Sequence, residues 1–96
     1  MPALDEVIHQ STRLRIMTAL NLLADDEYVN FVRLKALVEV SDGNLGAHLE
    51  TLGRAGYVRV DKQFIGKKPQ TMIFITAVGR EAYRSHIAQL RQLLEL

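Results

Sequence analysis

The chain has 96 residues, 48% of them hydrophobic and 24% charged, a composition typical of one globular domain with a modest core. It contains no cysteine, which excludes disulfides and thiolate metal sites. No apolar run approaches the length of a membrane span, about 18 residues. Residues 1–10 also lack the basic and apolar segments of a secretion signal, so we expect a cytoplasmic protein without a membrane partner.

The net charge of +1 hides an uneven distribution along the chain. Residues 1–30 hold two basic and five acidic side chains, whereas residues 54–71 hold five basic side chains and one acidic. The five are Arg54, Arg59, Lys62, Lys67 and Lys68. A local excess of positive charge is what a surface facing an anionic polymer requires, although plain solvated surfaces carry such clusters too.

The first twenty-odd residues predict a short arm and then a helix. Leu4, Val7 and Ile8 indicate an amphipathic turn or helical arm over about residues 1–10. Ser11 or Thr12 can cap the helix that follows. Its apolar stripe consists of Leu14, Met17, Leu20 and then Leu23 or Ala24, widened by Ile16 and Leu22.

Two shorter elements come next. Residues 28–31 are β-prone and long enough only for a small edge strand. Residues 31–38 return to helical spacing through Phe31, Leu34, Leu37 and Val38. A very short turn separates this helix from the next one, which is the arrangement of a helix-turn-helix.

The central helix is expected over residues 41–55. Leu45, Leu49 and Leu52 fall on one face, Ser41 can cap the start, and Gly56 can end the helix. The opposite face is small and polar, with Gly43, Ala47, Glu50 and Arg54, and with Asn44, His48 and Thr51 on its flank. A helix buried on one side and polar on the other suits insertion into a DNA major groove.

Three glycines inside this helix break the propensity rule. Gly43, Gly46 and Gly53 each cost about 1 kcal/mol relative to alanine in an exposed helix interior. Gly46 and Gly53 lie on one side of the helix, where close packing against a preceding helix explains them as well as close approach of a ligand does.

The hydrophobic period changes after Gly56. Residues 57–64 alternate through Val58 and Val60 and then loosely Phe64, which predicts a strand, and residues 71–75 form a second, more apolar strand. Residues 65–70 read as a polar turn with glycine and proline. We therefore expect a β-hairpin with a basic tip and a loop longer than the two-residue type.

Thr76 is the expected cap of a last helix over residues 77–94, which would be about 27 Å long. Its stripe comprises Tyr83, Ile87, Leu90 and Leu94. The compact core is already accounted for before this helix begins. We therefore expect its apolar face to pair with the same helix of a second subunit, together with the N-terminal arm. Docking back on its own domain is the alternative.

This order of elements resembles a winged helix-turn-helix domain, an α+β fold with a three-helix core, a two-stranded wing and a long C-terminal dimerisation helix. The segments RLRIMTAL, VSDGNLGAHLETLGRAGYV and KKPQTMIFITAVGREAY are similar to small archaeal and bacterial transcriptional regulators related to the MarR and ArsR groups. The resemblance runs from about Leu4 to Leu94. It implies one domain over residues 1–96, and a homodimeric regulator that binds specific double-stranded DNA.

The resemblance also implies which residues meet DNA. Helix 41–55 would enter the major groove and wing 58–75 would lie along the backbone. The recognition-helix positions are Ser41, Asp42, Gly43, Asn44, Ala47 and His48, and the wing positions are Lys62, Lys67, Lys68, Gln70 and Thr71. Thr51 and Arg54 complete the expected DNA-binding set. Gly46 replaces the usual Ser or Thr of the pattern, and Glu50 and Thr51 stand where relatives often carry lysines.

Each of these residues also has a plainer interpretation. Asn44 can read adenine through a paired donor and acceptor, or it can extend the helix cap. His48 can bond to a base edge or a phosphate, or it can be an idle surface histidine. Asp42 fits better as a first-turn carboxylate that the helix dipole favours than as a base reader. The basic side chains more readily meet phosphates than bases.

The remaining patterns favour neither catalysis nor metal binding. The serines lack a nucleophile elbow, no glycine-rich phosphate loop follows a strand, and the three histidines are far apart in the sequence. We expect no enzyme activity, cofactor or metal. The expected partners are DNA with an inverted-repeat operator and a second copy of the chain, contacted through Leu4, Val7, Ile8, Tyr83, Ile87, Leu90 and Leu94. The alternative function is a winged-helix protein–protein interaction module that does not bind DNA.

Overall fold

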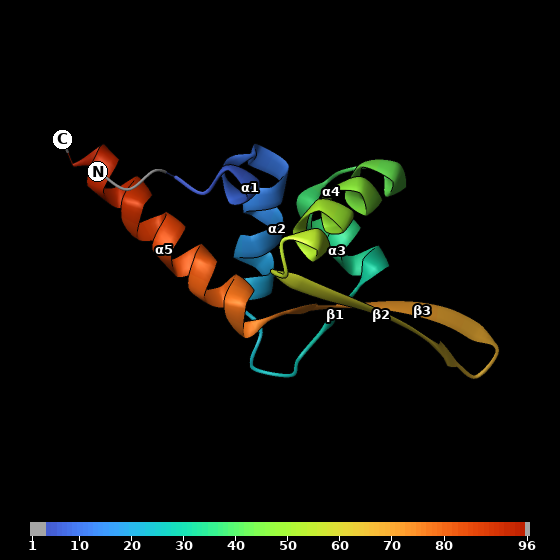
Figure 1. Cartoon of the computed structure of the whole chain (residues 1–96). Coiled ribbons are helices and arrows are strands. Elements are labelled where there is room, and N and C mark those ends of the chain that lie inside the picture. Colours follow the sequence, from blue (N-terminus) through green and yellow to red (C-terminus); the bar gives the residue numbers. More distant parts are fainter. Residues whose placement is uncertain (1–3, 96) are drawn as a thin grey trace.

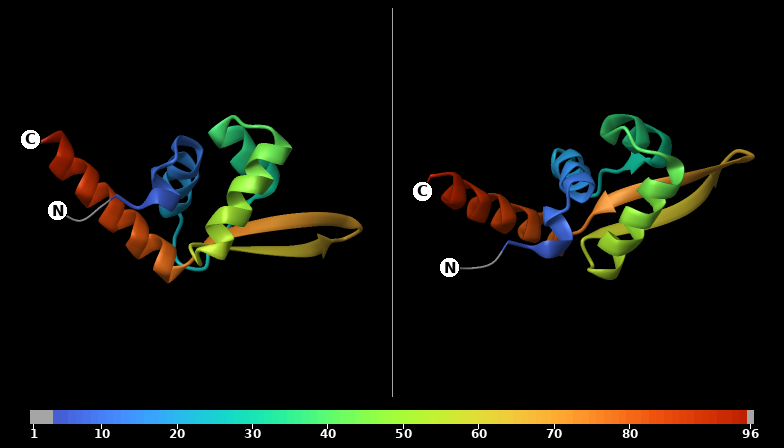
Figure 2. Two further views of the ribbon diagram at one scale, coloured as in Figure 1. Left: turned by 45° about the horizontal axis from the view of Figure 1, so that its top comes forward. Right: turned by 90° about the horizontal axis from the view of Figure 1, so that it is seen from above.

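A computed structural model describes residues 4–95 and contains the expected elements in the expected order (Figure 1). In chain order they are α1 (Glu6–His9), α2 (Ser11–Asn21), β1 (Val29–Asn30), α3 (Phe31–Val38), α4 (Asp42–Arg54), β2 (Val58–Ile65), β3 (Lys68–Ile75) and α5 (Ala77–Leu94). The hairpin β2–β3 and helix α5 extend from opposite sides of a body made by α1 to α4 (Figures 1 and 2).

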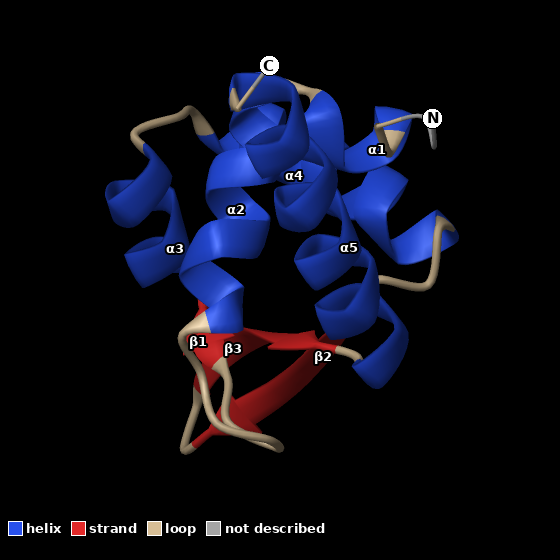
Figure 3. Ribbon diagram, turned by 90° about the vertical axis from the view of Figure 1, so that its left-hand side faces the viewer, coloured by secondary structure: helices blue, strands red, loops and turns tan. Residues whose placement is uncertain are grey.

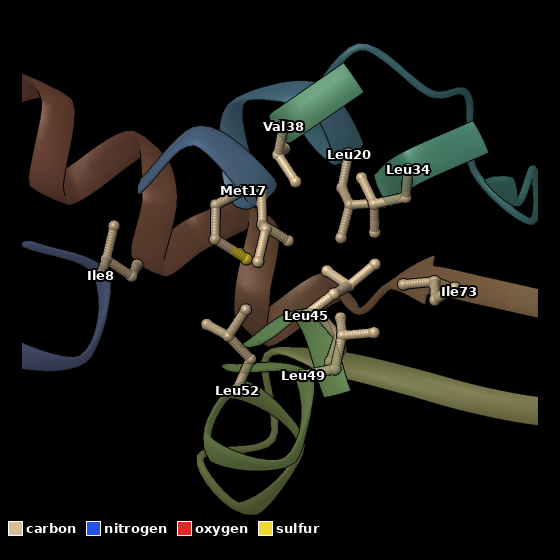
Figure 4. Packing of buried hydrophobic residues seen from close by; sticks show 11 residues of the cluster. Ile8, Met17, Leu20, Leu34, Val38, Leu45, Leu49, Leu52 and Ile73 are labelled. Carbon is tan, nitrogen blue, oxygen red and sulfur yellow. The ribbon is translucent and has the colours of Figure 1, made fainter. Parts of the chain in front are cut away.

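The core lies where α2, α3 and α4 converge over the base of the sheet (Figure 4). All three leucines of the predicted stripe on α4 are buried: Leu45, Leu49 and Leu52. They meet Ile16, Met17 and Leu20 of α2, Leu34 and Val38 of α3, and Val58 and Ile73 of the sheet. Burial of such side chains contributes roughly 1.5–3 kcal/mol each, so this cluster fixes the orientation of α4.

Helix α2 differs from the sequence-based expectation at both ends. Its cap is the side chain of Gln10, which accepts from the Arg13 backbone N–H at 2.9 Å, rather than Ser11 or Thr12. At the other end Leu22 is 84% exposed and does not widen the buried stripe. At 3.6 residues per turn, Leu22 lies on the side of the helix opposite the buried Met17 and Leu20, so the helical spacing itself turns it toward solvent.

The sheet has three antiparallel strands in the order β1-β3-β2 and lies beneath the helices (Figure 3). β1 pairs only with the inner end of β3, through Val29 with Ile73 and Asn30 with Met72. The outer part of the hairpin projects beyond this pairing and forms the two-stranded wing.

The expectation of a long hairpin loop is wrong. Ile65 pairs with Lys68, so only Gly66 and Lys67 connect the strands. Gly66 has a φ of +65°, and a positive φ at the first central residue is what the tight hairpin turns favoured by strand twist require. Pro69 has no N–H to donate, and it is tolerated inside β3 because β1 pairs only with Met72 and Ile73 and does not reach this part of the strand.

Tyr57 joins three segments that are distant in the sequence. Its hydroxyl donates to Asp5 Oδ2 at 2.6 Å, and its carbonyl accepts from the Thr76 N–H at 3.1 Å. Gly79, in the first turn of α5, packs so closely that an added Cβ would lie 2.0 Å from the Tyr57 oxygen. Thr76 caps α5 as expected, by accepting from the Gly79 N–H at 2.9 Å. The start of α5 is therefore locked to the end of the α4–β2 turn.

Within residues 4–95, no helix is both long enough and apolar enough to cross a membrane.

Candidate nucleic-acid interface

The outward face of α4 is open to solvent as the sequence predicts. Gly43, Asn44 and Ala47 are exposed. Ser41 caps the helix, because its hydroxyl accepts from the Asn44 backbone N–H at 3.2 Å. This bond uses the backbone of Asn44, so the Asn44 side-chain amide is free to face a partner.

Asp42 has a structural role besides its place in the first turn of α4. Its carboxylate forms an ion pair with Lys35 Nζ of α3 at 2.7 Å. The pair bridges the turn between the two helices of the helix-turn-helix. Both side chains are partly exposed, so we assign the pair a positioning effect and little stability.

His48 is half-buried and held by a residue that sequence reasoning missed. Arg13 of α2 lies with Nη1 3.2 Å from His48 Nδ1. A guanidinium can only donate, so Nδ1 accepts and neutral His48 carries its proton on Nε2. Burial, and secondly the charge of Arg13, lower the pKa of His48 below its usual value of 6.5. His48 is therefore a neutral N–H donor with a fixed tautomer at neutral pH.

The second half of α4 is more engaged in local contacts. The Thr51 hydroxyl donates to the Ala47 carbonyl at 3.3 Å, and Arg54 pairs with Glu50 at 3.6 Å one helical turn away. Both members of that ion pair are about 70% exposed. Exchange of the Glu50 partner for a phosphate would therefore cost Arg54 little.

The wing presents charge without structural partners. Every residue from 62 to 69 is exposed, and within residues 4–95 none of Lys62, Lys67 and Lys68 takes part in an ion pair. Gln70 and Thr71 are half-buried, and Gln70 Oε1 has no hydrogen-bond partner among the described residues. Free lysines on a projecting hairpin can follow a phosphate backbone.

A groove of about 730 Å³ separates α4 from the base of the wing. The helix contributes Gly46, Gly53, Glu50 and Arg54 to its walls, and the sheet contributes Lys62 and Thr71, over a floor that includes Leu49 and Val58. A Cβ added at Gly46 or Gly53 would meet nothing within 4 Å. The hypothesis that these glycines allow close helix packing is therefore wrong. They widen a groove that opens beside the expected DNA-binding residues.

The expected dimerisation residues fall into two groups. Ile8 is wholly buried in the core of its own chain, so its expected place at a dimer interface is wrong. Val7 and Tyr83 also pack against that core, and Tyr83 Oη lies 3.0 Å from Thr18 Oγ1. Ile87 and Leu90 are half-buried, and Leu94 is 77% exposed, on the part of α5 that extends from the body (Figure 2). Helix α5 thus docks on its own domain as far as the buried His86, and its exposed end with Leu94 extends beyond that contact.

The chain itself brings His9 and His86 together, with ring centroids 5.4 Å apart. His86 is 1% exposed, and neither ring nitrogen has a partner among the described residues. Burial, then the neighbouring His9, lower the pKa of His86, although Asp5 opposes the shift. No group of three or more His, Cys, Asp or Glu side chains in residues 4–95 is arranged to hold a metal ion.

The sequence model of a family described as winged helix DNA-binding domain matches residues 12–94. An uncharacterized protein of Methanocaldococcus jannaschii is 34% identical over 88 residues, which cover 92% of each chain.

Solved structures show the same architecture. A transcriptional regulator homologue from Pyrococcus horikoshii superimposes with a TM-score of 0.84 and 25% identity, covering 95% of this chain and 87% of that one. HlyU from Vibrio cholerae superimposes with a TM-score of 0.62 and 19% identity, covering 92% and 84%. At that identity the second likeness concerns the fold alone.

Proposed function

Because the chain belongs to the winged helix DNA-binding domain family, we propose that it is a homodimeric transcriptional regulator that binds specific sequences of double-stranded DNA. Membership of this family makes the chain a DNA-binding protein and not an enzyme, as expected from the sequence. In the proposed complex, α4 enters the major groove and the wing follows the neighbouring backbone.

The observation that carries the proposal is the solvent-exposed polar face of α4 beside a wing whose three lysines form no ion pair within residues 4–95. On α4, the Asn44 amide can bond adenine in the bidentate manner that the major groove allows. His48 offers an Nε2–H to an acceptor such as guanine O6 or N7. Ser41, Gly43, Ala47 and Thr51 let the helix approach the bases, while Arg54, Lys62, Lys67, Lys68, Gln70 and Thr71 face phosphates.

The proposed dimer pairs the outer half of α5 with the same segment of a second copy. Leu90 and Leu94 lie on that segment, and the two-stranded wing projects in the opposite direction (Figure 1). A two-fold dimer would present its recognition helices to half-sites about 34 Å apart, and its operator would be an inverted repeat.

Binding to random duplex DNA at a series of salt concentrations tests the central proposal. We expect log affinity to fall linearly with log salt, by nearly one unit for each phosphate neutralised. No binding at low salt, or a flat salt response, would favour the protein–protein interaction module instead.

A pair of substitutions on α4 tests the assignment of base reading. Asn44→Ala with His48→Ala should relax sequence preference by about 1–3 kcal/mol per lost contact, while binding to random DNA persists. Sequence selection from a random pool, with wild type and variant in parallel, measures this. An unchanged preferred sequence would remove these two residues from the base-reading set.

A further inference from the structure

The tip of the wing carries large apolar side chains that the fold does not use. Phe64 is 74% exposed and Ile65 is 55% exposed, and Phe64 is the most exposed aromatic side chain among residues 4–95. The hydrophobic core ends at the base of the sheet, at Val58 and Ile73. An exposed aromatic side chain at the end of a hairpin adds nothing to that core, which indicates that it contacts a binding partner.

The register of the hairpin shows which way Phe64 faces. Phe64 pairs with Pro69, and Lys62 pairs with Thr71 two positions closer to the body. Side chains two residues apart share one face of a strand. Lys62 and Thr71 line the groove beside α4, so Phe64 and Pro69 stand on the same side of the wing as that groove.

The tip is narrow and surrounded by positive charge. Only Gly66 and Lys67 connect the strands, and Lys62, Lys67 and Lys68 lie within two residues of Phe64 or of its partner Pro69 along the chain. A narrow apolar tip with flanking lysines complements a DNA groove, in which the base edges lie between two anionic phosphate backbones. Its face is continuous with the proposed DNA-binding surface of α4, which favours DNA over a lipid surface.

We propose that Phe64, backed by Pro69, is an apolar wedge that enters the minor groove and partly unstacks one base step beside the site of α4. The inference rests on the proposed function. Apolar side chains inserted between base steps kink a duplex, at a cost of a few kcal/mol for unstacking. Pyrimidine–purine steps deform most easily, so the wedge would add a preference for TA or CA steps at a position that no hydrogen bond reads.

Fluorescence of 2-aminopurine, which rises when the base loses its stacking partners, tests the wedge. The probe is a duplex selected by the wild-type protein from a random pool and resynthesised with 2-aminopurine at successive adenines of its TA and CA steps. We expect wild type to raise the fluorescence about twofold or more at one step per half-site. Phe64→Ala should lose that rise and the accompanying bend in a gel assay, while its affinity changes about tenfold or less because the unstacking cost is also removed.

Leu22→Ala is the matched control, because Leu22 is as exposed as Phe64 but lies at the end of α2, away from the wing. It should keep the fluorescence rise. The wedge is wrong if Phe64→Ala retains the rise, or if wild type binds DNA with a salt-dependent affinity and gives no rise at any step. Phe64-dependent binding to vesicles of anionic lipid without a DNA response would overturn it as well. Complete absence of DNA binding by wild type would instead overturn the proposed function on which the wedge depends.

Discussion

Helix α4 and the wing lie on either side of one groove and are built in opposite ways. α4 is fixed by three buried leucines, and two of its polar side chains are held by neighbours, Asp42 by Lys35 and His48 by Arg13. From residue 62 to residue 69 the wing is exposed, and its lysines have no acidic partners among the described residues. A surface that reads bases needs fixed donors and acceptors, whereas a surface that follows phosphates needs only charge and reach. In the proposed complex, the difference favours the helix for base reading by hydrogen bonds and the wing lysines for attraction to the backbone.

The largest expected effect is on stability and comes from weakening the packing of α4 against the core. Leu45→Ala removes a fully buried side chain from the junction of α4 with the core, and we expect a loss of about 2–5 kcal/mol in the free energy of unfolding. Urea denaturation followed by circular dichroism measures it. Leu22→Ala, at an exposed position, should change stability by about 0.5 kcal/mol or less. Equal losses in the two variants would mean that α4 is not anchored as described.

Removal of wing charge should affect binding without affecting stability. Lys67→Ala with Lys68→Ala should lower affinity for all duplexes alike and reduce the salt slope by about two per protomer. Melting temperature should not change, because neither lysine has a structural partner in residues 4–95. Lys67→Arg with Lys68→Arg keeps the charge and should restore the slope. Normal binding by the alanine variant would contradict the assignment of the wing to phosphates.

Substitution of Gly46 or Gly53 in α4 should have opposite effects on the stability of the free protein and on its affinity for DNA. Gly46→Ala and Gly53→Ala should each stabilise the free protein by about 0.5–1 kcal/mol, because alanine is the better helix former and its methyl group meets nothing. If a DNA strand lies in the groove beside them, the same methyl groups should weaken DNA binding. Thermal unfolding and duplex titration of the same variants measure both effects. Gly79→Ala is the control of opposite sign, since its Cβ would collide with the Tyr57 carbonyl and destabilise the fold.

The smallest expected effect is a dependence on pH. The pKa of His48 is lowered in the folded chain by burial and by Arg13, so the unfolded chain takes up a proton first as pH falls below about 6.5. His86 shifts in the same direction. Stability should therefore be constant above that pH and decline below it, until the folded-state pKa is reached. Proton NMR titration of the imidazole resonances should show the pKa of His48 below 6.5 and moving upward in Arg13→Ala. An unmoved value would show that Arg13 does not act on His48.

Local patterns in the sequence predicted most of the fold, because the spacing of apolar residues records which face of an element is buried. The leucine stripe, the Ser41 and Thr76 caps, and α5 from Ala77 to Leu94 are all confirmed. The errors occur where local patterns conflict or stop. Gly66 and Lys67 alone make the turn, and β3 therefore begins inside a segment whose proline and lysines look like a loop. Leu22 is apolar, but at helical spacing it lies opposite the buried Met17 and Leu20, so its apolar character alone was misleading.

The parts of the site that could not be predicted depend on contacts between distant segments. Arg13 and His48 are 35 positions apart, and no local feature of either residue indicates the other. The groove exists only once α4 crosses the base of the wing, so the exposed side of Gly46 and Gly53 could not be distinguished from a packed side by spacing. Phe64 continues an alternating pattern and reads as a strand residue, and only the length of the wing beyond β1 shows that it lies in water.

The junction at Tyr57 has a consequence for how two copies would act together. Tyr57 follows the last turn of α4 and bonds to two other segments. Its hydroxyl donates to Asp5 near the N-terminus, and its carbonyl accepts from Thr76 at the start of α5. Because these contacts hold the start of α5 against the end of α4, a rotation of α5 should move α4 with it. In the proposed dimer, a change in the angle between the two α5 helices would therefore change the distance between the two α4 helices, and with it the spacing of the half-sites that the dimer could bind.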